Sequence, residues 1–314
     1  MTWAFLRSEE RAGKDRYLRR WWQPSHSRDD VGVLSDQGTF TTNDGVTLAY
    51  NDSGGSGVPL VMLHGWGQTR EMFRHQLTGL GASRRVITYD QRGHGVSEKP
   101  HHGYRIARFA TDLEQLLDHL DVGRADLLGW SMGVSVIWSY LDMNGTGRVR
   151  RFVAVDQPAA VAAVPWMTAA EQAESGAIFG VDGLLELGGS IAGPGGDKVT
   201  EGFVRSMFTG EPAPEVWDLV AEQIRTTPAY AGVPLLFDHC AQDWRDVLPR
   251  IDVPTLVIGC DGSHVSPDSQ RFIASRIPGA QLHVFPADVA NSHFPFLENP
   301  VAFNSVVDEF LSTP

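Results

Sequence analysis

A serine set between two glycines is the residue in this sequence best placed for covalent chemistry. Gly129-Trp130-Ser131-Met132-Gly133 follows an apolar run and leads directly into a helical pattern. A serine at the apex of such a tight strand-to-helix turn is strained, and its hydroxyl is exposed above the sheet. The glycines are needed because a Cβ at either position would clash within the turn. The pattern therefore predicts that Ser131 is a nucleophile.

A serine hydroxyl is a weak nucleophile, so it needs a general base within hydrogen-bond reach. His293 is the candidate, because it follows the last expected strand and precedes the final helix. Its late place also agrees with the chain order Ser…Asp…His of enzymes that have this turn. His64 and His94 stand in glycine-containing turns, where we expect structural roles. The remaining candidates lie outside the motifs: His101, His102, His119 and His239.

Attack by a serine on a carbonyl requires two N–H donors that stabilise the developing negative charge on oxygen. We expect one to be the backbone N–H of Met132, directly after the nucleophile. We assign the other to Trp66, in the loop after the third strand. The indole of Trp66 either walls the acyl pocket or packs in the interior, and the two roles are compatible.

Four segments together resemble the α/β-hydrolase superfamily. They are His64-Gly65-Trp66-Gly67, the run from Asp90 to Ser97, the turn around Ser131, and the run from Ser292 to Glu298. The resemblance covers residues 38–314, and the segment 243–256 resembles the branch with bacterial arylesterases and cofactor-free haloperoxidase-like proteins. It implies an α/β-hydrolase fold, with a mostly parallel twisted sheet flanked by helices and an inserted helical cap. It also implies a Ser–His–acid triad and no cofactor.

The acid of the expected triad departs from the usual family pattern. Ser263 stands where the acid usually lies, and Asp261 comes two residues early. Certain esterases, the fungal zearalenone lactonases and the cofactor-free quinaldine dioxygenases, which this chain resembles here, take their acid from the end of strand six. Asp156 ends the corresponding strand of this chain, so we predict Asp156 as the acid and keep Asp261 as the alternative. Ser263 could help to hydrogen-bond the histidine.

The elements that must position these residues alternate between strand and helix. An Asn43-Asp44-Gly45 turn predicts a hairpin of residues 38–43 and 46–50. Further strands are expected at 58–63, 85–89, before the turn at Ser131, and at 151–156, 254–260 and 281–285. Helices are expected at 70–80, 104–120, 132–144, 235–248, 266–277 and 300–311. Such alternation predicts a parallel sheet buried on both faces.

The alternation is interrupted by a segment rich in Gly, Ala and Pro with no clear strand. We therefore expect a hydrolase core of residues 38–157 and 232–314, with a helical cap at 158–231. Ligands of open α/β sheets bind at the carboxyl ends of the strands, so the cap should roof the site. We predict substrate contacts from Trp166 and Trp217 of the cap and from Phe294. Alternatively, the cap aromatics pack on one another.

Residues 1–37 form a separate extension that mixes basic and aromatic residues. It could form an amphipathic helix on a membrane or a partner. The alternatives are a packed extension, a loose tail, or a start codon assigned too early. No signal-peptide pattern and no run of about 18 apolar residues is present, so no membrane insertion is expected.

Composition narrows the function further. The net charge of −12 makes nucleic acid an unsuitable partner. Cys240 and Cys260 have no metal-site spacing, and we expect buried thiols and no bound metal. A cytoplasmic location is the default expectation, and nothing in the sequence sets an oligomeric state.

The expected activity is hydrolysis of a carboxylic ester or lactone of a hydrophobic small molecule, through an acyl-enzyme on Ser131. A cofactor-free oxygenase or perhydrolase, or a C–C bond hydrolase, would use the same residues and is the alternative. Epoxide and haloalkane hydrolysis are disfavoured because they need a carboxylate at position 131. A ligand-sensing role without catalysis is disfavoured because both nucleophile and histidine are present.

Overall fold

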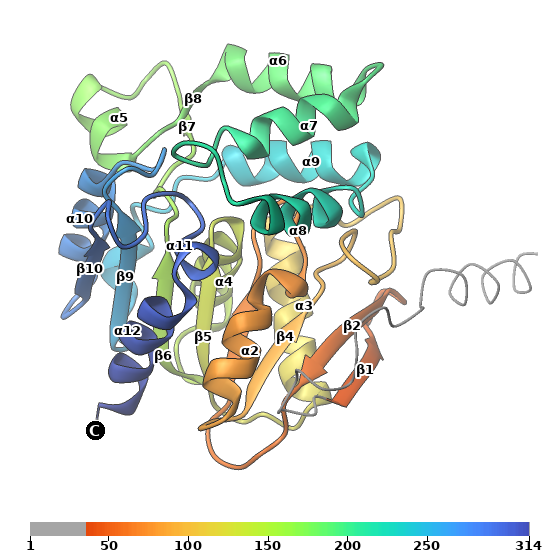
Figure 1. Ribbon diagram of the computed structural model, residues 1–314, viewed down its shortest axis with the longest axis vertical. Coiled ribbons are helices and arrows are strands. Elements are labelled where there is room, and N and C mark those ends of the chain that lie inside the picture. The colour runs from red at the N-terminus through yellow and green to blue at the C-terminus, as the bar shows by residue number, and fades with distance from the viewer. Residues whose placement is uncertain (1–35, 314) are drawn as a thin grey trace, which may run out of the picture. The chain divides into compact units, whose positions relative to one another are not determined.

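An eight-stranded sheet runs through residues 36–313, the part of the chain that this computed structural model describes (Figure 1). Its order is β1 (Asp36–Thr41), β2 (Thr47–Asp52), β4 (Val86–Tyr89), β3 (Leu60–Leu63), β5 (Ala125–Trp130), β6 (Val149–Val155), β9 (Thr255–Cys260) and β10 (Gln281–Phe285). The pairs β1–β2 and β2–β4 are antiparallel, and the other pairs are parallel. The predicted mostly parallel α/β fold is confirmed, while residues 1–35 of the predicted extension lie outside the described residues.

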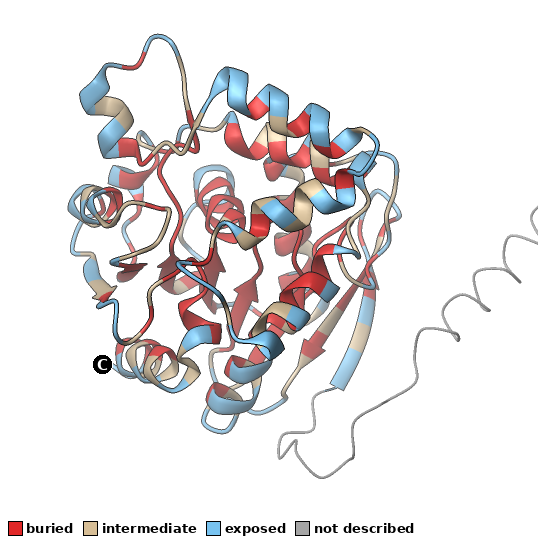
Figure 2. Ribbon diagram, turned by 45° about the horizontal axis from the view of Figure 1, so that its top comes forward, coloured by how far each residue is buried: buried red, intermediate tan, exposed pale blue. Residues whose placement is uncertain are grey.

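Helices cover both faces of the sheet. In Figure 1, α2 (Arg74–Gly81) and α12 (Pro300–Ser312) lie in front of it, while α3 (Ile106–His119) and α4 (Met132–Asn144) lie behind it. The 3-10 turn η1 (Arg70–Phe73) leads into α2, α10 (Pro267–Arg276) packs beside β9, and the short α11 (Pro295–Glu298) precedes α12. Because helices shield both faces, β3, β5 and β9 are buried along their whole length (Figure 2). This explains why these strands read as continuous apolar runs.

A second helical layer stands over the carboxyl ends of the strands (Figure 1). It follows β6 and consists of β7 (Ala162–Ala163), α5 (Ala169–Ser175), β8 (Phe179–Gly180), α6 (Val181–Ala192), α7 (Gly196–Arg205), α8 (Pro214–Ile224) and α9 (Ala229–Cys240). The sequence pattern showed no strand here, but β7 and β8 form a two-residue parallel pair. Such short pairings have no periodicity that a sequence could reveal.

One expected helix has different bounds in the structure. Instead of residues 235–248, α9 covers Ala229–Cys240, and η2 (Leu248–Arg250) forms a separate 3-10 turn. Pro234 lies inside α9, where it removes one backbone donor without ending the helix. Because α9 packs against α6, it belongs with the inserted helices as much as with the core.

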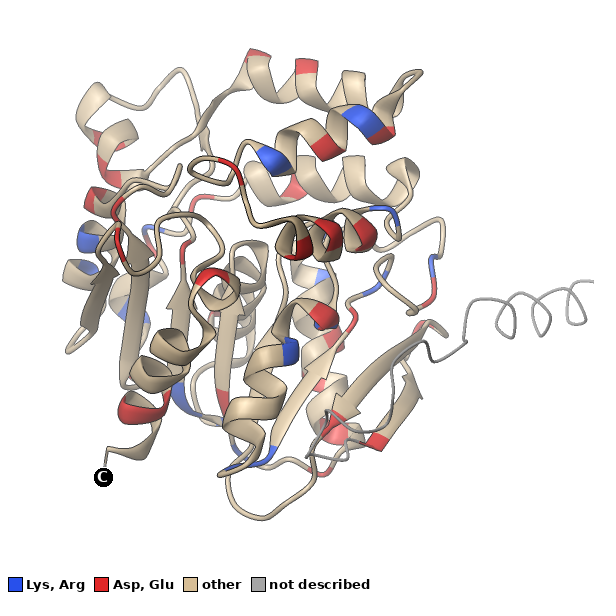
Figure 3. Ribbon diagram, viewed as in Figure 1, with Lys and Arg blue, Asp and Glu red and all other residues tan. Residues whose placement is uncertain are grey.

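Lys, Arg, Asp and Glu residues lie mainly on the helices and loops of the described chain (Figure 3). No helix within residues 36–313 is long and apolar enough to cross a membrane.

Candidate active site

The turn between β5 and α4 has the geometry that the sequence predicts. Ser131 has φ 53° and ψ −128°, a conformation that non-glycine residues rarely adopt. A Cβ on Gly129 would lie 2.5 Å from the nitrogen of Val134, and one on Gly133 would lie 2.2 Å from the carbonyl oxygen of Leu63. Both contacts are with backbone, so only glycine fits at these two positions. The strained serine at the head of α4 is therefore built into the fold.

His293 and Asp156 lie together although 137 residues separate them. His293 Nδ1 donates to Oδ2 of Asp156 at 2.7 Å, and both side chains are buried. The backbone holds each partner in place: the Asp156 N–H donates to the Ile258 carbonyl at 2.8 Å, and the Trp130 indole donates to the His293 carbonyl at 2.8 Å. This is the hydrogen bond that the sequence predicts between the base and the acid at the end of β6.

Ser263 and Asp261, the two other residues considered for the acid, have different surroundings. The sequence suggested a hydrogen bond from Ser263 to the histidine. Instead, Ser263 Oγ donates to Asp156 Oδ2 at 2.5 Å. Asp261 is exposed, and its backbone N–H pairs with the Phe285 carbonyl at 3.0 Å. Asp261 therefore does not occupy the place of the alternative acid.

Burial shapes the protonation of the pair. It lowers the pKa of His293 to about 3, so the imidazole is neutral near pH 7 and can accept a proton. Burial also raises the pKa of Asp156 to about 7, and the hydrogen bond from Ser263 acts in the opposite direction. Ser263 thus favours the charged carboxylate, which is the form that stabilises a protonated histidine.

Ser131 and His293 line the same cavity. No hydrogen bond joins their side chains within the described residues. Catalytic hydrogen bonds of this kind are often long in an empty enzyme and tighten when substrate binds. The shared cavity is therefore where His293 would have to reach the Ser131 hydroxyl.

The two predicted oxyanion donors belong to segments that lie next to the serine. Met132 is the first residue of α4, so its N–H has no acceptor within the helix. Trp66 follows β3 in a loop that passes close to Ser131, since a Cβ on Gly65 would be 3.1 Å from the Ser131 Cβ. The Trp66 indole donates to the Gly232 carbonyl at 2.8 Å, and its ring borders the cavity.

The two histidines with expected structural roles hold this loop. His64 Nε2 accepts the Gln91 N–H at 3.0 Å, and His94 Nε2 accepts the Gly67 N–H at 3.2 Å. In each ring, Nδ1 donates to a backbone carbonyl. The acceptor is Gly65 for His64 and Arg92 for His94. Burial lowers the pKa of both histidines, to about 4 and about 3, which keeps the accepting nitrogens free of a proton. These hydrogen bonds thus fix the loop that carries Trp66, the predicted oxyanion loop.

The cavity above Ser131 contains about 540 Å³ of empty space, including its opening to solvent. Its wall is mostly apolar and comes from the core and the helical layer: Trp66, Trp130, Pro158, Val161, Ile178, Phe179, Phe203, Val204, Met207, Leu236, Cys240, Val265 and Phe294.

Of the three predicted substrate contacts, only Phe294 lines this cavity. Trp166 is 81% exposed. Trp217 packs beside Phe208 and under the Arg205 guanidinium. Neither tryptophan lines the cavity, so substrate contact by Trp166 and Trp217 stays a prediction.

The cavity also contains polar residues that sequence reasoning missed. Gln68, His239 and His264 line it, and each has a buried side-chain atom without a hydrogen-bond partner within residues 36–313. The His264 ring packs edge-on against His293 at 4.6 Å between centroids. The only sequence feature that could have indicated a role for His239 is its place as a polar residue in a mostly apolar helix. In this same part of the chain, no three His, Cys, Asp or Glu side chains are grouped to hold a metal.

The strained serine, the buried His–Asp pair and the oxyanion loop together define a serine-hydrolase type of site. The chain belongs to the alpha/beta hydrolase family, whose model matches residues 60–306.

Similar proteins carry the names of peroxidases and lactonases. A non-heme chloroperoxidase of Kitasatospora aureofaciens is 32% identical over 254 residues, covering 78% of this chain and 89% of that protein. The 3-oxoadipate enol-lactonase 2 of Acinetobacter baylyi is 28% identical over 279 residues, covering 88% of this chain and 97% of that protein. The crystal structure of an enol-lactonase from Burkholderia xenovorans has a TM-score of 0.75 and 25% identity, covering 88% of this chain and all of that chain. The chain is thus an α/β hydrolase related to haloperoxidases and enol-lactonases.

Proposed function

We propose that this protein hydrolyses a carboxylic ester or lactone of a hydrophobic small molecule through an acyl-enzyme on Ser131. The observation that carries the proposal is the 2.7 Å hydrogen bond between His293 and Asp156, beside an apolar cavity that Ser131 also lines. The relatives named as enol-lactonases support a substrate of this kind.

In this mechanism Ser131 Oγ attacks the carbonyl carbon while His293 Nε2 takes the hydroxyl proton. Asp156 holds the imidazole by Nδ1 and stabilises its cation. The N–H groups of Trp66 and Met132 stabilise the negative oxygen of the tetrahedral intermediate. The imidazolium then protonates the leaving alcohol oxygen, and water activated by the same histidine releases the acid. In a lactone, the leaving alcohol stays attached to the acyl group.

We also propose that residues 158–231 act as a cap on a core formed by residues 38–157 and 232–314. Phe179, Phe203 and Met207 of this segment line the cavity, which supports a role in substrate selection. Helix α9 begins at Ala229, so it crosses the proposed boundary between residues 231 and 232, and it supplies Leu236 to the same wall.

Perhydrolysis is the second candidate, because relatives of this chain carry the name chloroperoxidase. It would use the same acyl-enzyme, with hydrogen peroxide instead of water as the second nucleophile and a peracid as product. Water and hydrogen peroxide would compete for the same acyl-enzyme. The product, acid or peracid, therefore distinguishes the two activities, and the role of Ser131 is the same in both.

The test is turnover of p-nitrophenyl esters of increasing chain length, beside macrocyclic lactones. We expect measurable hydrolysis by the wild type and a loss of about 10³-fold or more in the Ser131→Ala variant. Addition of hydrogen peroxide should leave the rate of acyl-enzyme formation unchanged. Retention of near-wild-type turnover by Ser131→Ala would exclude the proposed mechanism.

A further inference from the structure

Gln68 and His239 are buried side chains of the cavity wall that lack partners within residues 36–313, whereas His264 in the same wall is only partly buried. Gln68 is 1% exposed, and neither its Oε1 nor its Nε2 has a hydrogen bond. His239 is 5% exposed, and its Nδ1 has no hydrogen bond. Both residues border the cavity that contains Ser131. Buried polar groups are nearly always paired in folded proteins, so each of these two needs an explanation.

The two residues come from different layers of the structure and are held by their backbones. Gln68 follows the oxyanion loop, and its N–H donates to the Gly65 carbonyl at 3.3 Å. The next residue, Thr69, donates from its hydroxyl to Gln223 of α8 at 2.8 Å, which anchors this segment to the helical layer. His239 lies near the end of α9, among apolar residues of that helix. Neither side chain is needed for the hydrogen bonds that keep the fold together.

The rest of the cavity restricts what these groups could bind. No lysine or arginine is among the described residues that line it, so a carboxylate or phosphate on the substrate would have no countercharge. Burial, reinforced by nearby His293, lowers the pKa of His239 to about 3. His239 is therefore a neutral imidazole with one donor and one acceptor nitrogen, and the Gln68 amide likewise offers both.

We infer that Gln68 and His239 bind an uncharged hydroxyl group of the substrate, on a part of the molecule away from the bond that is cleaved. A hydroxyl both donates and accepts, which matches the two unpartnered groups. This inference rests on the proposed function and narrows its substrate class to neutral, hydroxylated esters or lactones with an otherwise apolar body. Gln68 and His239 are then specificity-determining residues, while Ser131, His293 and Asp156 perform the chemistry.

The inference is tested with matched substrates that differ only by a hydroxyl group. The pairs are p-nitrophenyl phenylacetate against its 2-, 3- and 4-hydroxyphenyl derivatives, and p-nitrophenyl hexanoate against its hydroxylated derivatives. The wild type should favour at least one hydroxylated ester, and His239→Leu and Gln68→Leu should each lower that preference in kcat/KM by about 10- to 100-fold. The readout is the ratio of kcat/KM for the two esters of a pair, so a change in turnover common to both esters does not affect it. Leu235→Met is the control, since it changes a buried residue of the same helix outside the cavity wall without changing polarity.

Binding without turnover separates this inference from the proposed function. Calorimetry on the Ser131→Ala variant should give tighter binding of the preferred hydroxylated ester than of its parent, and added His239→Leu should abolish the difference. If this difference in binding is found but the wild type hydrolyses no ester, the inference is supported and only the proposed function is rejected. Equal binding of both members of every pair, or no binding of any, would overturn the inference. So would a hydroxyl preference that survives both His239→Leu and Gln68→Leu.

Discussion

At the residue scale, the carboxylate that we propose as the acid is the most distinctive feature of the site. Asp156 ends β6 and bonds to His293, whereas Ser263 occupies the position usual for the acid and supports Asp156 through a second hydrogen bond to the same oxygen. In the proposed triad, the orienting carboxylate therefore follows β6 instead of lying in the loop after β9. Both the carboxylate and the serine that supports it can be tested by substitution.

Replacing the carboxylate should impair catalysis strongly. Asp156→Asn should lower kcat by roughly 10²–10⁴, as the corresponding amide substitution does in serine proteases, because the amide holds the wrong tautomer of the histidine. Asp261→Asn is the matched control and should leave kcat nearly unchanged, since Asp261 is exposed. Steady-state kinetics on one p-nitrophenyl ester measure both. A larger loss in Asp261→Asn than in Asp156→Asn would contradict the assignment.

Replacing Ser263 should change the pH dependence of catalysis. Its hydrogen bond lowers the pKa of Asp156, so Ser263→Ala should raise that pKa further. The carboxylate would then be protonated at higher pH, and the acid limb of the kcat/KM profile should move to higher pH. We expect kcat/KM at neutral pH to fall by about 2- to 10-fold. Ser263→Thr keeps the hydroxyl and should keep the wild-type profile. An acid limb that does not move in Ser263→Ala would show that the hydroxyl does not tune the acid.

At the element scale, the helical layer over the strand ends supplies most of the cavity wall. Phe203 of α7 borders both the cavity and the Trp66 ring, with 6.0 Å between ring centroids. Phe203→Ala should therefore favour longer acyl chains, changing the ratio of kcat/KM for long and short esters by about 10-fold. Trp166→Ala, at an exposed position of the same layer, should leave that ratio unchanged. If the two variants behave alike, the cavity wall does not select substrate.

The order of elements could be predicted from the sequence because periodicity and glycine spacing are local properties. Met132–Asn144 is predicted to the residue, since Gly133 and the apolar repeat define its start. The cap could be predicted only as helical. Trp166 and Trp217 are large apolar residues of the kind that often line pockets. Where their side chains point depends on how the cap helices pack. Gln68 and His239 could not be found either, since a missing hydrogen-bond partner exists only in the folded chain.

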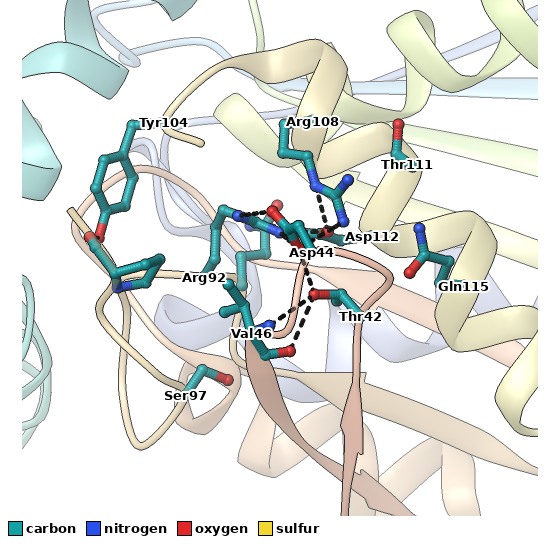
Figure 4. A network of polar contacts seen from close by, with 12 residues as sticks. Thr42, Asp44, Val46, Arg92, Ser97, Tyr104, Arg108, Thr111, Asp112 and Gln115 are labelled. Atoms are coloured by element: carbon teal, nitrogen blue, oxygen red, sulfur yellow. Dashed lines mark hydrogen bonds and ion pairs between the residues drawn. The ribbon is translucent and has the colours of Figure 1, made fainter. Parts of the chain in front are cut away.

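At the scale of the whole molecule, a buried ion-pair network ties the β1–β2 turn to the loop after β4 and to α3 (Figure 4). Arg92 is fully buried and donates to both oxygens of Asp112, at 2.6 and 2.7 Å. It also donates to both oxygens of Asp44 in the turn, at 3.0 and 3.1 Å. Arg108 of α3 bonds to the same two carboxylates. The antiparallel edge of the sheet is thus fastened to a helix behind it.

Breaking this network should affect stability more than catalysis. Asp112→Asn removes a buried charge and leaves Arg92 incompletely paired, which should cost about 3 kcal/mol of unfolding free energy. Asp268→Asn breaks the exposed pair with Arg271 and should cost about 0.5 kcal/mol or less. Urea unfolding measures both. Equal effects would mean that the network does not anchor the edge of the sheet.

Ser131 should form a covalent intermediate with the help of His293 and Asp156, and every catalytic step proposed for this protein depends on it. Intact-protein mass spectrometry after treatment with a fluorophosphonate, followed by peptide mapping, tests this most directly. We predict one adduct on Ser131 of the wild type, loss of ester turnover in step with labelling, slower labelling of Asp156→Asn, and no adduct on Ser131→Ala. A wild-type protein that hydrolyses esters while Ser131 stays unlabelled, or a Ser131→Ala variant that keeps its turnover, would contradict the claim.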